Sequence, residues 1–225
     1  MSAFIAFPLN SELEHKLKEA CRRVRREPPE IQHLPFVIDL ICELVDVGMN
    51  FYFAGLIQRL KLGGWGITII NMALKTAKGG LHVMIRKILK NMTNEQLHPL
   101  MGLLEEMLLE HDGKASLGFP IEGELAERLK ENVRRIQNES PPSQHSEYTL
   151  TVMYALTDTG LDFYFLEAAR RLQVGQWGMK TVNWGVVIAR KAIHGAMKKL
   201  LPTLNDEQLA TLSGFVDEIM IEIAG

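Results

Sequence analysis

The sequence predicts an all-α protein built as a tandem duplication of two four-helix units packed with pseudo-two-fold symmetry. Three observations lead to this prediction. The chain aligns with itself without a gap at a shift of 112 residues. Within each unit the apolar residues recur at helical spacing. Finally, no stretch of useful length alternates between apolar and polar residues, so we expect no β-sheet.

The self-alignment is dense along nearly the whole chain. We count about 38 identities in roughly 113 overlapping pairs, far above a chance shift. The segment FPLNSELEHKLKEACRRV at 7–24 matches FPIEGELAERLKENVRRI at 119–136, and DVGMNFYF at 46–53 matches DTGLDFYF at 158–165. We therefore expect helical repeat unit 1 at 1–112 and helical repeat unit 2 at 113–225.

Capping and breaking residues delimit the expected helices of the first unit. Ser11 with Glu14 fits a capping box ahead of a helix to residue 26, and Pro28 ends it. Gly63 is placed like a C-terminal cap of the second helix. Thr93 or Asn94 caps the fourth. The expected ranges are about 12–26, 36–62, 67–90 and 94–110, and in the second unit about 121–138, 147–174, 179–201 and 205–223.

The composition is that of a globular protein. The chain has 225 residues, a hydrophobic fraction of 47%, a charged fraction of 23% and a net charge of -2. This balance argues against a nucleic-acid binder that works by bulk positive charge. The N-terminus lacks the basic region of a signal peptide, and the acids within 36–60 argue against a transmembrane span there. We expect a cytoplasmic location, a protein partner and no nucleic acid, with the oligomeric state open.

Sequence motifs for catalysis or metal binding are missing. The chain has no His-Glu-Xaa-Xaa-His, no Cys-Xaa-Xaa-Cys and no Gly-Xaa-Ser-Xaa-Gly. Its two cysteines, Cys21 and Cys42, become Val133 and Tyr154 in the second unit. We therefore expect no metal site and no catalytic residue, motifs imply no cofactor, and a non-enzymatic role is favoured.

The third helix of each unit carries a polar stripe. Its members share one helix face because they are spaced by three or four residues. A solvated face is the favoured interpretation, and a basic surface for an anionic partner or a membrane interface is the alternative. The stripe consists of Thr68, Asn71, Lys75, Lys78, His82 and Arg86 in unit 1 and Lys180, Asn183, Arg190, His194 and Lys198 in unit 2.

Aromatic residues recur at equivalent positions. We expect the rings of the second helices to be mostly buried between the units, with the two tryptophans pinning tight turns in the core. A ligand pocket lined by these rings is the alternative. The candidate residues are Phe51, Tyr52, Phe53 and Trp65, with Phe163, Tyr164, Phe165 and Trp177.

Polar residues that recur in both units are candidates for a polar clamp or a ligand contact. In an antiparallel hairpin, residues equally far from the turn lie at the same level. Asp46 and His82 stand 18 residues to either side of residue 64, and Asp158 and His194 stand likewise about residue 176. We predict a contact within each pair and a raised histidine pKa. The remaining recurring candidates are Arg59, Arg171, Asn71 and Asn183.

Three functions follow as hypotheses. The first is a non-enzymatic helical interaction or scaffold protein. The second is a binder of a small apolar or haem-like ligand between the repeats, with His82 and His194 as candidate axial ligands. The third is an enzyme with buried acid–base residues, Asp46 and Asp158 among them. A large internal cavity would favour the second hypothesis.

Overall fold

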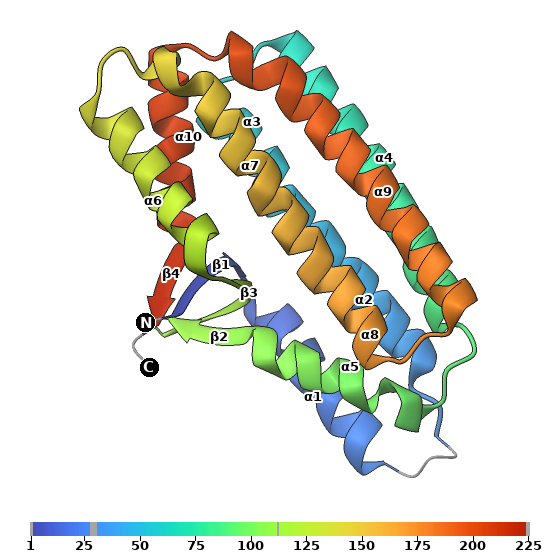
Figure 1. Ribbon diagram of the computed structural model, residues 1–225. Helices are drawn as coiled ribbons and strands as arrows, with labels where there is room; N and C mark the ends of the chain where they lie inside the picture. Colours follow the sequence, from blue (N-terminus) through green and yellow to red (C-terminus); the bar gives the residue numbers. More distant parts are fainter. Residues whose placement is uncertain (1, 28–30, 112, 224–225) are drawn as a thin grey trace.

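The computed structural model describes residues 2–27, 31–111 and 113–223 and is mostly helical, as predicted (Figure 1). The helices of the first half are α1 (Ser11–Arg26), α2 (Leu34–Met49), α3 (Gly55–Arg59), α4 (Gly64–Leu89) and α5 (Asn94–Met107). Those of the second half are α6 (Gly123–Asn138), α7 (Ser146–Leu161), α8 (Ala168–Arg171), α9 (Gln176–Leu200) and α10 (Asp206–Ile219).

The expectation of no β-sheet is wrong. Four antiparallel strands form one sheet in the order β2-β3-β1-β4. The strands are β1 (Ser2–Pro8), β2 (Leu108–His111), β3 (Lys114–Ile121) and β4 (Met220–Ile223). The central strands β1 and β3 are buried along most of their length, so their sequences are almost continuously apolar rather than alternating.

The sheet joins the first half of the chain to the second. β1 pairs with β3, and each of these central strands also pairs with the short strand that ends the other half. Ala6 lies opposite Gly118, and the pairing runs symmetrically to either side, from Ala3 with Ile121 to Pro8 with Ser116. Neither half therefore completes this sheet with its own strands.

A wide helical turn interrupts the second long helix of each half. Residues Asn50–Ala54 between α2 and α3, and residues Asp162–Glu167 between α7 and α8, are π-helical. The axis nevertheless continues, so 34–59 and 146–171 each form one long helix. A π-segment widens the helix by one residue per turn and is frequent at functional sites. Both segments begin 112 residues apart and contain the Phe-Tyr-Phe triplets.

The long helices form layers. α4 and α9 pack against each other along one edge of the molecule, and α2 and α7 lie between that pair and the rest (Figure 1). The sheet, with α1, α5, α6 and α10, covers the other side. Gly80 and Gly185 allow the close approach of α4 and α9, because an added Cβ would lie 2.9 Å from Ile188 and 2.7 Å from Met84, respectively.

Several helix ends differ from the sequence prediction. Asn10, not Ser11, caps α1, its side chain accepting a hydrogen bond from the Leu13 amide at 2.8 Å. Gly63 precedes α4 as its N-cap, and Lys61 takes the left-handed conformation that ends α3. Thr93, one of the two expected caps, is the N-cap of α5, and with Gln96 it forms a capping box. The fourth expected helices are shorter, since their last three residues in the first half lie in β2 and their last four in the second half form β4.

The helix over Leu34–Arg59 is long and apolar enough to cross a membrane by length and composition alone. Only part of its surface is buried in the folded chain. Its apolar side chains pack into the largest cluster of buried residues, together with α1, α4, α5 and α9. A second cluster joins the sheet to α6, α7 and α10.

Candidate functional site

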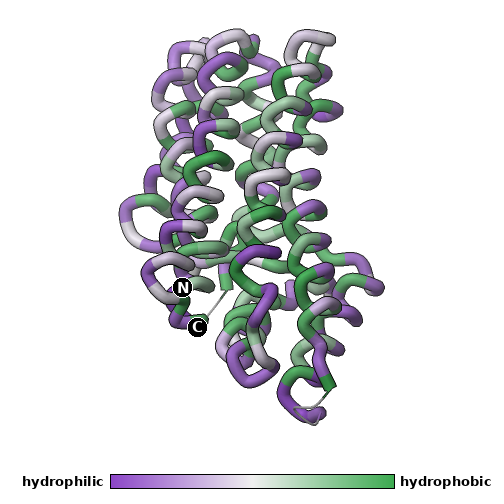
Figure 2. The backbone as a smooth tube through the Cα atoms, turned by 90° about the vertical axis from the view of Figure 1, so that its right-hand side faces the viewer, coloured by the Kyte–Doolittle hydropathy of each residue, from purple (hydrophilic) through white to green (hydrophobic). Residues whose placement is uncertain are grey.

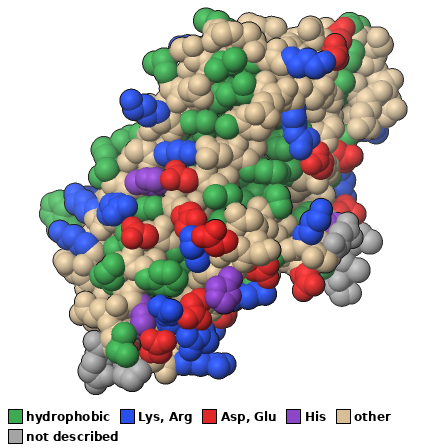
Figure 3. Space-filling view, turned by 180° about the vertical axis from the view of Figure 1, so that it is seen from behind, with side chains coloured by type: hydrophobic (Ala, Val, Ile, Leu, Met, Phe, Trp, Pro, Cys, Tyr) green, Lys and Arg blue, Asp and Glu red, His purple; other side chains and the backbone are tan. Residues whose placement is uncertain are grey.

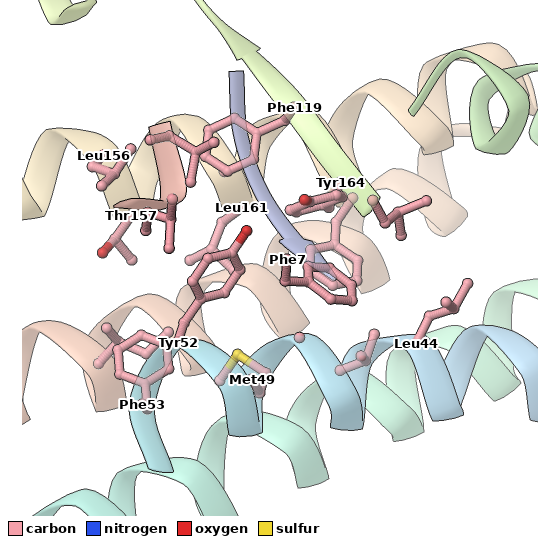
Figure 4. Close-up of a pocket in the computed structure, with 18 of the residues that line it drawn as sticks. Phe7, Leu44, Met49, Tyr52, Phe53, Phe119, Leu156, Thr157, Leu161 and Tyr164 are labelled. Carbon is pink, nitrogen blue, oxygen red and sulfur yellow. The ribbon is translucent and has the colours of Figure 1, made fainter. Parts of the chain in front are cut away.

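An apolar cavity lies between the two halves of the chain, beside the sheet. Its volume is about 190 Å³, and side chains from α2, α7, the π-segments, the strands and α10 line it (Figure 4). A smaller cavity of about 60 Å³ adjoins it, and the two share the lining residues Met49, Phe53, Leu56, Met153, Ile193 and Met197. The described side chains that line the cavity are apolar or uncharged, and none of them is acidic or basic.

The lining residues come in pairs. Apart from Leu56, Leu100 and Met197, every lining residue has a counterpart 112 positions along the chain that also lines the cavity. The pairs nearest the π-segments are Leu44 with Leu156, Gly48 with Gly160, Met49 with Leu161, Tyr52 with Tyr164 and Phe53 with Phe165. Equivalent positions of the two halves therefore line the cavity together.

Tyr52 and Tyr164 supply the main polar atoms of the cavity. Figure 4 shows their hydroxyl groups pointing toward each other. Both oxygens are buried, and neither has a hydrogen-bond partner of good geometry among the described residues. Burial raises the pKa of Tyr164, and burial together with the neighbouring Tyr164 raises the pKa of Tyr52 well above its usual value. Both phenols therefore stay neutral and can donate a hydrogen bond.

Each tyrosine is held by a phenylalanine from the sheet. The Phe7 ring meets the Tyr52 ring edge-on at 5.8 Å, and the Phe119 ring meets the Tyr164 ring in the same way at 5.3 Å. A glycine in the facing helix makes room for each phenylalanine. An added Cβ at Gly48 would lie 3.0 Å from Phe7, and one at Gly160 would lie 3.1 Å from Phe119.

The aromatic candidates divide into three groups. Tyr52, Phe53, Tyr164 and Phe165 line the cavity. Phe51 and Phe163 do not line it, and all six residues have intermediate exposure in the folded chain. The expectation that tryptophan pins each turn in the core is wrong, because Trp65 and Trp177 are 59% and 80% exposed. The turns are closed instead by Lys61 and Gln173 in the left-handed conformation.

Sequence reasoning missed Phe7 and Phe119 as site residues. Both precede proline, and the Phe-Pro pair recurs at the start of each half. The recurring Phe-Pro pair could have marked these residues as candidates. Their contact with the tyrosines could not be predicted, because it depends on β1 and β3, and the sequence periodicity did not indicate these strands.

Both predicted aspartate–histidine contacts are present. The His82 Nε2 atom lies 3.3 Å from Asp46 Oδ1, and the His194 Nε2 atom lies 3.1 Å from Asp158 Oδ1. Each aspartate also meets a cation from the same helix as the histidine. Lys78 Nζ is 3.4 Å from Asp46, and Arg190 Nε is 2.7 Å from Asp158.

The predicted rise in histidine pKa is wrong for His194, whose pKa is lowered. Burial is the largest cause, and it outweighs the opposing charge of Asp158, while the nearby Arg190 lowers the pKa further. The Tyr154 ring stacks on the His194 ring at 4.2 Å and contributes to this burial. The first half has Cys42 at the position of Tyr154.

These polar clusters tie the second and third long helices together outside the cavity. Asn50 and Asp162, the first residues of the two π-segments, belong to them. Lys78 Nζ donates to Asn50 Oδ1 at 2.7 Å, and Arg190 contacts Asp162 Oδ1 at 3.0 Å. The clusters therefore fix the start of each π-segment, which in turn directs the tyrosines.

The remaining polar candidates also lie outside the cavity. Arg59 pairs with Glu218 of α10 at 3.0 Å, and Arg171 pairs with Glu106 of α5 at 2.8 Å, so each joins one half to the other. Asn71 and Asn183 are exposed on α4 and α9.

The structure does not support haem ligation by the histidines. Neither His82 nor His194 lines the cavity, and both Nε2 atoms face aspartates. The cavity volume of about 190 Å³ is also below the roughly 300–1,000 Å³ usual for drug-sized ligands. No group of three or more metal-binding side chains occurs in the part of the chain that the structure describes.

Comparison with known proteins adds no functional information, since no protein-family model, curated protein or solved structure matches this chain.

Proposed function

We propose that the protein binds a small apolar molecule of one or two rings in the cavity between its halves. The single observation that carries this proposal is the apolar lining of the cavity with two buried tyrosine hydroxyls facing each other. A cavity of about 150 Å³ lined by aliphatic and aromatic side chains binds benzene, so about 190 Å³ suits a slightly larger molecule.

The chemistry of the lining narrows the ligand class. A charged ligand would lose its hydration with no opposite charge to compensate, because the lining has none. A ligand with one hydrogen-bond acceptor, such as an aryl ketone, would accept from Tyr52 or Tyr164. Leaving such buried hydroxyls without a partner costs on the order of 1–3 kcal/mol, which favours an acceptor over a pure hydrocarbon.

The paired lining supports a tandem duplication as the origin of the site. In this interpretation the two units, 1–112 and 113–225, each contribute one tyrosine, one phenylalanine and one glycine to a shared cavity. The site is then the intramolecular equivalent of an interface between two identical subunits. A scaffold role is the weaker alternative, because it assigns no purpose to the cavity.

Acetophenone and ethylbenzene test this proposal, since they have nearly the same shape and differ in the carbonyl acceptor. We expect both to raise the melting temperature, with acetophenone binding more tightly by calorimetry. Tyr52→Phe should reduce the preference for acetophenone and leave ethylbenzene binding nearly unchanged. Tyr148→Phe is the matched control, because Tyr148 packs under Arg135 and does not line the cavity.

A cavity-filling variant gives the second arm of the test. Leu161→Phe adds a ring inside the cavity, and it should abolish binding of both compounds while the chain stays folded. Absence of any binding to the unmodified protein, or unchanged binding to Leu161→Phe, contradicts the proposal.

A further inference from the structure

The outer faces of α4 and α9 expose large apolar side chains. All three tryptophans of the chain lie on these two helices, and Trp65, Trp177 and Trp184 are 59%, 80% and 52% exposed. Met72, Val83 and Val187 are exposed on the same helices. Large apolar side chains gathered on one surface mark an interaction site more often than chance exposure.

The charged residues of these two helices are all basic. The helices contain no aspartate or glutamate, although the chain as a whole has 27 acidic and 25 basic residues. Lys78 and Arg190 point toward the aspartates of the neighbouring helices, and Arg86 meets Asp39. The other basic side chains of these helices are exposed to solvent: Lys75, Lys87, Lys180, Lys191, Lys198 and Lys199.

Tryptophans and lysines share one face of α9. Trp177, Lys180, Trp184, Lys191 and Lys198 are separated by three, four or seven residues, which brings them onto one side of the helix. The Lys180 ammonium group lies 4.5 Å from the centre of the Trp177 ring. The face is therefore apolar and cationic at once.

The corresponding face of α4 extends this surface. Trp65, Met72 and Val83 are exposed on one side of α4, flanked by Lys75 and Lys87. Because α4 and α9 form an outer layer with their buried sides on the core, both exposed faces look away from the molecule (Figure 1). Figure 2 is seen from the side of the molecule on which α4 and α9 lie. Figure 3, seen from behind, shows basic and hydrophobic side chains interspersed along the edge of the molecule that these helices form.

We propose that the α4–α9 face, defined by Trp65, Trp177 and Trp184 with the exposed lysines of both helices, docks onto the surface of an anionic lipid bilayer. Tryptophan favours the level of the lipid headgroups, where an apolar ring and a polar N–H are both accommodated. Lysines near an anionic leaflet each contribute on the order of 1 kcal/mol. Aliphatic side chains between them can enter the acyl boundary.

Other occupants fit this surface less well. A second copy would bring two lysine-rich faces together, and like charges oppose such contact. Nucleic acid would satisfy the lysines, but it offers no apolar layer for Met72, Val83 and Val187. Charge and apolar exposure together therefore favour an anionic bilayer.

The three tryptophans serve as built-in reporters of this docking. Vesicles of phosphatidylcholine with phosphatidylglycerol should bind the full chain in a sedimentation assay, whereas phosphatidylcholine alone should bind weakly. Binding should shift the tryptophan emission to the blue, and brominated acyl chains should quench it. Raised salt should weaken the binding.

Charge reversal on the face gives the decisive comparison. Lys180→Glu with Lys191→Glu and Lys198→Glu should lower vesicle partitioning by at least roughly a hundredfold, because loss of the three lysines alone removes about 1 kcal/mol each and ~1.4 kcal/mol is a factor of ten. The control reverses Lys18, Lys114 and Lys130, which lie on α1, β3 and α6. This control changes the net charge equally and should retain nearly full binding.

Removal of the rings separates membrane docking from simple charge attraction. Trp177→Ser with Trp184→Ser should weaken vesicle binding and leave the melting temperature nearly unchanged, because both rings are exposed.

Equal loss of vesicle binding in the two triple lysine variants contradicts the proposal. The proposal is also contradicted if brominated lipid does not quench the tryptophan emission, or if the double tryptophan variant binds vesicles at full strength. Binding of duplex DNA as tightly as vesicles, or self-association through this face, would contradict it as well.

Discussion

Ala6 and Gly118 lie directly opposite each other in the two central strands, although 112 residues of chain separate them. The two backbones leave no space for a second side chain here. A Cβ on Gly118 would lie 2.8 Å from the Ala6 Cβ, 2.9 Å from Leu109 and 3.0 Å from the Ile5 carbonyl oxygen. The central pair of the sheet thus depends on the smallest residue at this position.

Gly118→Ala should therefore destabilise the protein by about 1–3 kcal/mol, as overpacking in a rigid core does. Gly79→Ala is the matched control, since nothing lies near its added Cβ and the residue is in the interior of α4. The control should stabilise by roughly 0.5–1 kcal/mol through helix propensity. Urea unfolding of both variants checks the contrast, and equal stability would refute the steric argument.

The isolated segment 1–112 should not be a stable monomer. It lacks β3 and β4, which pair with β1, and it lacks α9, which packs along α4. Two copies can restore both contacts about a two-fold axis, so we expect a dimer that dissociates and unfolds on dilution. Analytical ultracentrifugation with circular dichroism measures this. A monomeric segment as stable as the whole chain would show that the halves are independent.

His194 should make stability depend on pH. Its pKa is lowered from 6.5 by burial first, so the unfolded chain binds more protons than the folded chain in the window just below that value. The free energy of unfolding should consequently be greatest above about pH 6.5 and fall as acid is added through the lowered pKa. Urea titrations across this range test the slope. In His194→Asn the part of the slope due to this histidine should vanish.

Gly160→Ala should separate stability from ligand binding. The added Cβ would lie 3.1 Å from the Phe119 ring, which borders the cavity and can shift into it. Higher helix propensity then offsets the strain, so the melting temperature should change little. Acetophenone affinity should fall because the displaced ring occupies ligand space. Unchanged affinity would show that Phe119 does not shape the cavity, and Gly48→Ala offers the equivalent test at Phe7.

The helices could be predicted from the sequence because their signals are local. Thr93 caps α5 as one of the two expected residues, and the apolar spacing of α1 and α6 gives their buried faces directly. The aspartate–histidine contacts could also be predicted locally. Two helices joined by a short turn have the same rise per residue, so residues equally far from the turn lie at the same level.

The sheet and the cavity depend on distant partners and gave no such signal. β2 and β4 are four residues long and follow α5 and α10 directly, so the sequence pattern places Leu108 and Met220 in the preceding helices. The π-segments keep the helical axis and thus leave the periodicity unbroken. The exposure of Trp177 could not be predicted either, since its recurrence in both halves is equally consistent with a core position.

The pairing of β4 with β1 has a consequence for the order of the chain. Ile223 lies opposite Ser2 in the pairing of β4 with β1, just as His111 lies opposite Lys114 in the pairing of β2 with β3. The chain could therefore be joined between Ile223 and Ser2 and cut between His111 and Lys114, because these two positions are equivalent in the sheet. A circular permutant that begins at Lys114 and ends at His111, with a short linker across the original ends, would keep every strand and helix contact.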